Sequence, residues 1–234
     1  MFEDQINAAD ILFDMLPAEQ LKSSNFLLVC LSLEGVAFCN HLASKLDLDY
    51  ELFFSAGIMA PNNPECEIAC VGESEEIVLN DALITCFGIT QDFVYGQAKR
   101  VYEEKVLKQV YKYRKGNLLS FIKGRNILLV NDGCESGAKL TVAAKSMASL
   151  GAASISLACA VMPESLAISS AAFLDFIYCA KKAQKFVNTA FYYKTKLAFS
   201  EAEVLKILEE SPHYLPLQKV KEQSKEQNKE QIKE

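Results

Sequence analysis

Residues 128–139 read Leu-Leu-Val-Asn-Asp-Gly-Cys-Glu-Ser-Gly-Ala-Lys, and this stretch decides the fold. It begins inside a continuous apolar run, which is typical of a strand buried on both faces of a parallel sheet. Apolar residues at helical spacing follow it, from Leu140 to Leu150. A short loop of polar residues and glycines therefore joins a buried strand to a helix, at the edge of the sheet where ligands bind in open α/β folds.

This loop has the groups that could hold an anion. We expect backbone N–H groups at the start of the helix to point at the anion, with the helix dipole behind them. Ser136 would add a hydroxyl donor, and the carboxylate of Asp132 could meet a sugar hydroxyl or, through water, a Mg²⁺ ion. Capping alone also explains Asp, Gly and Ser in such a turn, so the residues leave a structural role and a binding role open. The loop lacks the Gly-Lys-[Ser/Thr] ending of a Walker loop and the glycines of a Rossmann fingerprint.

The rest of the chain predicts an α/β fold, with a parallel sheet flanked by helices and a small antiparallel hood. Apolar runs predict strands, and helical spacing predicts helices. The predicted strands are 25–31, 50–54, 125–130, 154–161 and 176–179, and the predicted helices are 3–16, 36–46, 140–150 and 200–208. Such alternation builds parallel sheets. Two short strands, 67–71 and 76–79, form the hood at about 58–90, and a long helix runs from Thr90 towards Tyr113.

Two segments of different composition are expected along the chain. Residues 1–210 are predicted to form one domain that includes the hood. Residues 211–234 form a low-complexity Lys/Glu/Gln tail, in which Lys-Glu-Gln repeats from Lys221 onwards. The repeat has no apolar stripe that could pack on the domain, so we expect the tail to be disordered.

Composition disfavours several classes of function. The 234 residues carry 24 basic and 30 acidic side chains, and this balance without a basic aromatic stripe disfavours nucleic-acid binding. No apolar run reaches the roughly 18 residues of a membrane span, and the acidic start lacks a signal-peptide pattern. We therefore expect a cytoplasmic protein without a membrane partner. The eight cysteines are dispersed in apolar runs, which indicates buried small side chains rather than disulfides or a metal–thiolate site.

Residues 130–138, Val-Asn-Asp-Gly-Cys-Glu-Ser-Gly-Ala, resemble a loop of type I phosphoribosyltransferases. That loop binds phosphoribosyl pyrophosphate (PRPP) and usually reads Val-Asp-Asp-Gly-x-Ala-Thr-Gly-Ala-Thr. Residues 31–36, Leu-Ser-Leu-Glu-Gly-Val, resemble the family's Leu-Pro-Arg-Gly-Gly-Val. Residues 2–4, 61–65 and 160–166 are similar to further motifs of its stand-alone bacterial branch, so the resemblance covers most of the chain.

The resemblance implies a ligand, a reaction and a set of site residues. In the family, Mg²⁺ and PRPP bind over the sheet edge and a nitrogenous base displaces pyrophosphate. The partner would be a small phosphorylated sugar or nucleotide, Mg²⁺ would be a cofactor only with PRPP, and the homodimer common in the family is implied. Asp132 would contact the ribose or Mg²⁺ in catalysis. The implied binding loop is Asn131, Asp132, Gly133, Cys134, Glu135, Ser136, Gly137, Ala138 and Lys139, and the implied pyrophosphate loop is Leu33, Glu34 and Gly35.

The residues that depart from the family pattern lie in the two loops that would bind the phosphate and the pyrophosphate. Asn131 removes a carboxylate, and Glu135 adds one beside the phosphate, where Lys139 supplies a compensating cation. Leu33 and Glu34 replace the Arg and first Gly of the pyrophosphate loop. Two hypotheses follow: a working transferase for an unidentified base, or a catalytically inactive protein of this fold with a binding, regulatory or assembly role. The departures favour weakened or lost transfer.

Overall fold

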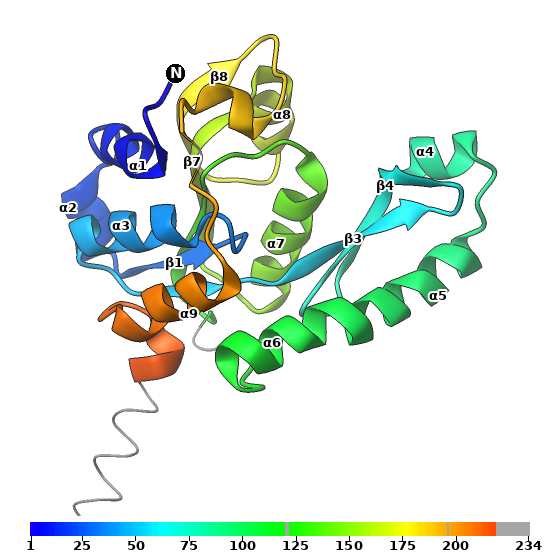
Figure 1. Ribbon diagram of the computed structural model, residues 1–234, viewed down its shortest axis with the longest axis horizontal. Helices are drawn as coiled ribbons and strands as arrows, with labels where there is room; N and C mark the ends of the chain where they lie inside the picture. The colour runs from blue at the N-terminus through cyan, green and yellow to red at the C-terminus, as the bar shows by residue number, and fades with distance from the viewer. Residues whose placement is uncertain (120–121, 196, 219–234) are drawn as a thin grey trace, which may run out of the picture.

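The central sheet has five parallel strands in the order β2-β1-β6-β7-β8 (Figure 1). The computed structural model describes residues 1–119, 122–195 and 197–218. The strands are β1 (Phe26–Cys30), β2 (Tyr50–Leu52), β6 (Asn126–Asn131), β7 (Ser154–Pro163) and β8 (Ile177–Ala183). The whole of β1 and the centre of β6 are buried, as their apolar runs predict.

Helices cover both faces of this sheet (Figure 1). One face carries α1 (Gln5–Phe13) and α3 (Val36–Leu46), with α2 (Ala18–Ser23) beside them, and the other carries α7 (Gly137–Ser149) and α8 (Glu164–Ser170). Buried side chains form two clusters, and neighbouring residues of β1 divide between them: Leu28 packs in one and Leu27 in the other. This is the alternation expected of a strand between two layers.

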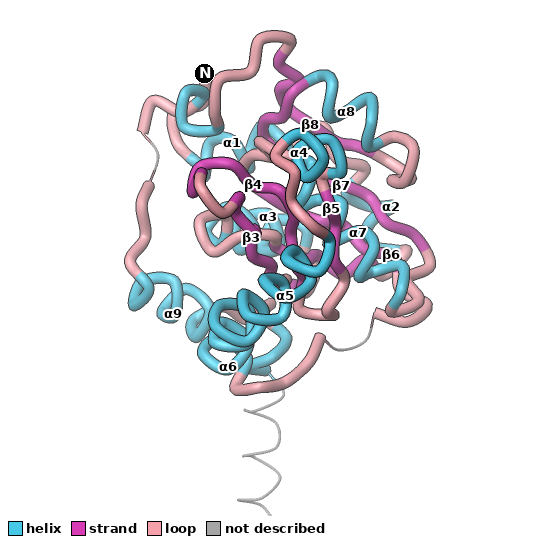
Figure 2. The backbone as a smooth tube through the Cα atoms, turned by 90° about the vertical axis from the view of Figure 1, so that its right-hand side faces the viewer, coloured by secondary structure: helices cyan, strands magenta, loops and turns pink. Residues whose placement is uncertain are grey.

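The hood is a separate antiparallel sheet in the order β3-β4-β5, as predicted. It consists of β3 (Ser55–Ala60), β4 (Asn63–Gly72) and β5 (Ile77–Leu79), followed by α4 (Asp81–Cys86). The predicted long helix is α5 (Gln91–Val101) and α6 (Leu107–Arg114), joined by one π-helical turn, η1 (Tyr102–Val106). The hood projects from the side of the central sheet with α5 along it, and Figure 2 views it from that side.

The C-terminal part of the domain returns to the sheet. It contains a 3₁₀ turn, η2 (Thr189–Tyr192), and α9 (Glu201–Glu210), whose start is fixed by a capping box between Ser200 and Glu203. The prediction that the tail starts at residue 211 differs from the structure. Tyr214 is fully buried, and its hydroxyl donates to the carbonyl of Tyr113 at 3.2 Å. Residues 211–217 therefore pack with the domain, while the repeats from Lys221 lie outside the described residues.

A buried ion cluster ties the hood to the central sheet. Arg114, at the end of α6, is almost fully buried and pairs with Glu73, just after β4. Its Nη1 lies 3.8 Å from Oε2 of Glu51 on β2. Glu73 also accepts a hydrogen bond from the backbone N–H of Phe54 at 2.9 Å. Burial lowers the pKa of Arg114, and the attraction of Glu51 opposes this shift. Because a buried charge is costly without partners, this cluster constrains where the hood sits.

Two further features bear on the sequence predictions. Six of the eight free cysteines are buried, as expected, whereas Cys86 is exposed and Cys66 is partly exposed. Within the described ranges, none of the helices has the length and apolar character needed to cross a membrane.

Candidate ligand-binding site

The predicted binding loop borders a cleft at the carboxyl edge of the sheet. The loop leaves β6 at Asn131 and enters α7 at Gly137. The cleft has a volume of about 450 Å³, and seven of the nine predicted loop residues line it: residues 131–136 and Lys139. Gly137 and Ala138 form the first positions of α7 instead. We call this space the main cleft.

The start of α7 lacks a hydrogen bond from its N-cap side chain. Ser136 is the N-cap residue in an extended conformation, but its hydroxyl makes no capping hydrogen bond. The first N–H groups of a helix have no partner within the helix, and here no capping side chain takes them. Ser136 and Lys139 are both exposed at this end. The dipole of α7 and the Lys139 ammonium therefore both favour negative charge here.

Both carboxylates of the loop are held by donors. Glu135 accepts a hydrogen bond on Oε1 from the backbone N–H of Thr189, at 2.7 Å. Asp132 is only 3% exposed, and its Oδ2 accepts from Nε2 of Gln5 at 2.8 Å. The hydroxyl of Tyr193 donates to the backbone carbonyl of Asp132 at 2.6 Å. Burial, followed by the charge of Asp132, raises the pKa of Tyr193, so this phenol stays a neutral donor.

Asn131 and Gly133 fix the backbone of the loop. The Asn131 amide accepts from the hydroxyl of Ser32 at 2.7 Å and donates to the carbonyl of Gly133 at 2.6 Å. The side-chain amide thus links the loop to the segment after β1 and also closes its own turn. Gly133 is required by close packing, because a Cβ there would lie 2.4 Å from Cγ2 of Thr189. Gly133 is thus both the residue whose carbonyl Asn131 binds and the point where η2 approaches the loop.

Gln5 joins the two predicted loops and was missed by the sequence analysis. Its side chain is fully buried, and Nε2 donates to the backbone carbonyl of Glu34 at 2.9 Å as well as to Asp132. A signal for it exists in the sequence. Gln5 shares the buried face of α1 with Ala8, Ala9 and Leu12, and a polar residue in an apolar helical stripe is expected to have a buried partner. Thr189, also missed, carries no comparable signal.

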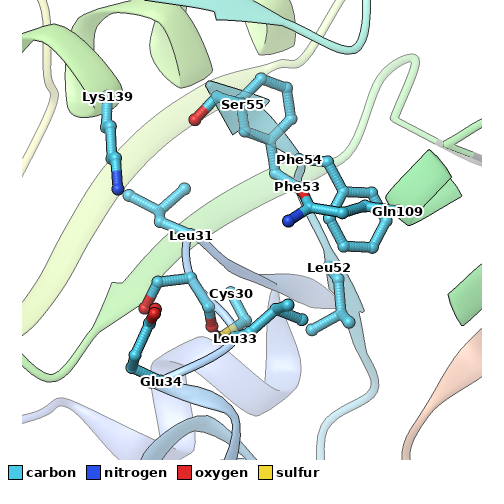
Figure 3. A pocket seen from close by; sticks show the side chains of 11 residues that line it. Cys30, Leu31, Leu33, Glu34, Leu52, Phe53, Phe54, Ser55, Gln109 and Lys139 are labelled. Carbon is cyan, nitrogen blue, oxygen red and sulfur yellow. Dashed lines mark hydrogen bonds between the residues drawn. The ribbon is translucent and has the colours of Figure 1, made fainter. Parts of the chain in front are cut away.

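A smaller side chamber of about 110 Å³ adjoins the main cleft (Figure 3). Leu31, Ser32, Glu34 and Lys139 line both spaces. In Figure 3, Lys139 and Glu34 approach the chamber from opposite sides. Two of the three residues of the predicted pyrophosphate loop, Leu33 and Glu34, line it, whereas Gly35 is the N-cap residue of α3.

Glu67 of the hood strand β4 is a further side chain of the main cleft that sequence reasoning did not single out. Its Oε1 is buried, and among the described residues no group donates a hydrogen bond to it. Burial raises the pKa of Glu67, and nearby Lys139 opposes this shift. The side chain lies over Gly57, where a Cβ would come within 2.5 Å of Oε2.

The donor set does not fit a metal ion held by the protein. In the part of the chain that the structure describes, no group of three or more His, Cys, Asp or Glu side chains could hold one. Asp132, the carboxylate predicted to contact Mg²⁺ or ribose, is buried and bonded to Gln5. The catalytic role of Asp132 therefore stays a prediction.

Comparisons with known proteins support the predicted resemblance. No protein-family model matches the sequence. Two proteins from strains of Mycobacterium tuberculosis, each named "Putative phosphoribosyl transferase", are 24% identical over 215 residues, which is 90% of this chain. The chain spans about half of their length, 47%. The crystal structure of TT1426 from Thermus thermophilus superimposes with a TM-score of 0.72 at 22% identity, covering 90% of this chain and 98% of that one. The chain thus has the predicted α/β fold with its hood, and it resembles phosphoribosyltransferases over nine-tenths of its length.

Proposed function

We propose that the chain binds a phosphorylated sugar of the ribose 5-phosphate class, with one phosphate at the start of α7. The observation that carries this proposal is the uncapped start of α7, which opens with Lys139 into the main cleft. The volume of the cleft lies within the range of about 300–1,000 Å³ that is usual for small-molecule sites. The resemblance of residues 130–138 to a PRPP loop adds independent support.

The charges of the loop are compatible with this ligand. Each like-charge pair at about 4 Å would cost on the order of 4 kcal/mol before screening, so a free Glu135 beside a phosphate would be a serious obstacle. The hydrogen bond from Thr189 satisfies Oε1 of Glu135 and fixes that side chain on η2. Asp132 is likewise engaged below the loop by Gln5. The exposed side chains at the start of α7 are those of Glu135, Ser136 and Lys139. Lys139 is thus the cation that offsets the charge of Glu135 beside a bound phosphate.

Binding is better supported than transfer. A transferase must stabilise the charge that develops on the departing pyrophosphate, and the chain has Leu33 and Glu34 in the loop that the resemblance assigns to this task. We therefore propose a binding or regulatory role as the main function. Turnover of radiolabelled PRPP against a panel of purine and pyrimidine bases tests the alternative, a working phosphoribosyltransferase that uses Mg²⁺ with PRPP.

Thermal denaturation with ribose 5-phosphate tests the proposed binding. A ligand at 100 times its Kd stabilises the folded state by about 2.7 kcal/mol, so the midpoint should rise by several degrees. Lys139→Met should abolish most of the rise. Lys145→Met is the matched control, because Lys145 is exposed on the same helix and lies outside the cleft. Equal responses of the two variants, or no response of the wild-type chain to millimolar ligand, would contradict the proposal.

A further inference from the structure

We infer that the ligand carries a single phosphate group, because the side chamber excludes the second cluster of negative charge that PRPP would bring. This inference rests on the proposed function, and it narrows the ligand to a phosphomonoester of a sugar or nucleoside. A ligand anchored at the start of α7 extends along the main cleft, and the side chamber adjoins that cleft through Leu31, Ser32, Glu34 and Lys139.

Carboxylates line both spaces: Glu34 borders both, and the main cleft also has Glu67, Asp132 and Glu135. Among the described residues that line either space, Lys139 is the one cation, and it is shared between them. Once Lys139 faces a phosphate at α7, the side chamber keeps Glu34 and the neutral side chains of Ser55 and Gln109. A pyrophosphate there would meet a carboxylate without a lysine or arginine to offset it.

Two backbone N–H groups at and just after the end of the predicted pyrophosphate loop already donate within the chain. The N–H of Gly35 donates to the hydroxyl of Ser32 at 3.1 Å, and the N–H of Val36 donates to the carbonyl of Leu33 at 3.2 Å. Backbone N–H groups can replace side-chain cations only when they point at the ligand. Here the N–H groups of Gly35 and Val36 donate within the turn, and the chamber walls include the apolar side chains of Phe53 and Phe54.

The position of Glu67 indicates that the ligand donates a hydrogen bond in the main cleft. Glu67 lines the main cleft, and its buried Oε1 has no donor among the described residues. A buried polar atom is costly unless it forms a hydrogen bond, so a hydroxyl or N–H group of the ligand would complete this site. Ribose 5-phosphate and nucleoside monophosphates offer such donors, as does the ribose of PRPP, so this contact favours a sugar ligand and the selectivity against PRPP rests on the side chamber.

Calorimetric titration of the full chain tests this selectivity. We expect ribose 5-phosphate to bind at least tenfold more tightly than PRPP, with and without Mg²⁺. Glu34→Gln should improve PRPP affinity several-fold and ribose 5-phosphate affinity by a smaller factor, because Glu34 lines both spaces but only PRPP would place a second cluster of negative charge in the side chamber. The fold should be kept, since the contact of Glu34 to Gln5 uses the backbone carbonyl. Glu103→Gln, an exposed position on η1 with the same charge change, should alter neither affinity.

The outcomes separate the two proposals. If PRPP binds as tightly as ribose 5-phosphate, or if Glu34→Gln leaves PRPP affinity unchanged, the exclusion by the side chamber is overturned while the proposed function stands. If ribose 5-phosphate, PRPP and inorganic phosphate all fail to bind, the proposed function is overturned and this inference falls with it.

Discussion

Replacing Asn131 by the acid usual in phosphoribosyltransferases should destabilise this chain. In the wild-type loop, Nδ2 of Asn131 donates to the carbonyl of Gly133 at 2.6 Å, and Oδ1 accepts from Ser32. Asn131→Asp keeps the second hydrogen bond but replaces the donor of the first with a carboxylate oxygen. An ionised carboxylate would then face a carbonyl oxygen in a half-buried position.

The expected cost at pH 7 is about 2 kcal/mol. The lost hydrogen bond contributes about 1 kcal/mol, and leaving the carbonyl of Gly133 facing an acceptor adds a similar amount. Since one pKa unit corresponds to 1.36 kcal/mol, the pKa of the new acid in the folded chain should rise from about 3.9 to about 5.4. Protonation of the introduced carboxylate restores the donor. The loss of stability is therefore complete above the raised pKa and should fall below about 1 kcal/mol at about pH 4.4.

Urea unfolding at about pH 7 and about pH 4.4, on either side of the raised pKa, measures this loss. Asn62→Asp is the control, since Asn62 lies in an exposed turn of the hood and the net charge changes equally. The free energy of unfolding of Asn131→Asp should be lower than that of Asn62→Asp at neutral pH, and the gap should narrow at the acidic pH. Equal stabilities at neutral pH, or a gap that does not respond to pH, would refute the reasoning.

Three further substitutions test other contacts. Gln5→Met should lower the free energy of unfolding by about 2–3 kcal/mol in urea titrations, because it removes both hydrogen bonds between the two loops. Gly133→Ala should cost about 1–3 kcal/mol through its clash with Thr189, and adding Thr189→Ser, which removes the clashing methyl, should recover part of the loss. Arg114→Met should cost about 3–5 kcal/mol because Glu73 loses its buried counterion, and a second change, Glu73→Gln, should restore part of the thermal stability.

Local patterns predicted most of the fold. The apolar runs predicted β1 and β6 within a residue or two, the predicted strand 76–79 matches β5 within one residue, and the predicted strand 67–71 covers the second half of β4. Strand β3 was missed because its residues, Ser-Ala-Gly-Ile-Met-Ala, include only one β-branched side chain and show no alternation. Helix α7 begins at Gly137 rather than Leu140, since small residues at its start carry no amphipathic signal.

The sequence predicted where the binding loop lies, but it did not predict which side chains and backbone groups hydrogen-bond to that loop. The loop at 131–139 could be located because strand, turn and helix follow one another in the chain. The donors that hold it come from 54 and 127 residues away, Thr189 for Glu135 and Gln5 for Asp132. No local pattern specifies such distant contacts. From the sequence alone, Glu135 is therefore expected only to repel a phosphate.

The departures from the family pattern have different physical consequences in the two loops, and this difference favours binding over transfer. At positions 131 and 135 the changed side chains have specific partners, so the loop where we propose that the phosphate binds keeps a defined structure. At position 33 the chain has an apolar wall, and at position 34 a carboxylate that faces the chamber. Binding a phosphomonoester needs only the first loop, whereas transfer needs charge stabilisation at both ends of the ligand at once. We therefore expect a protein with one intact end to retain a sugar phosphate and to stabilise a departing pyrophosphate poorly.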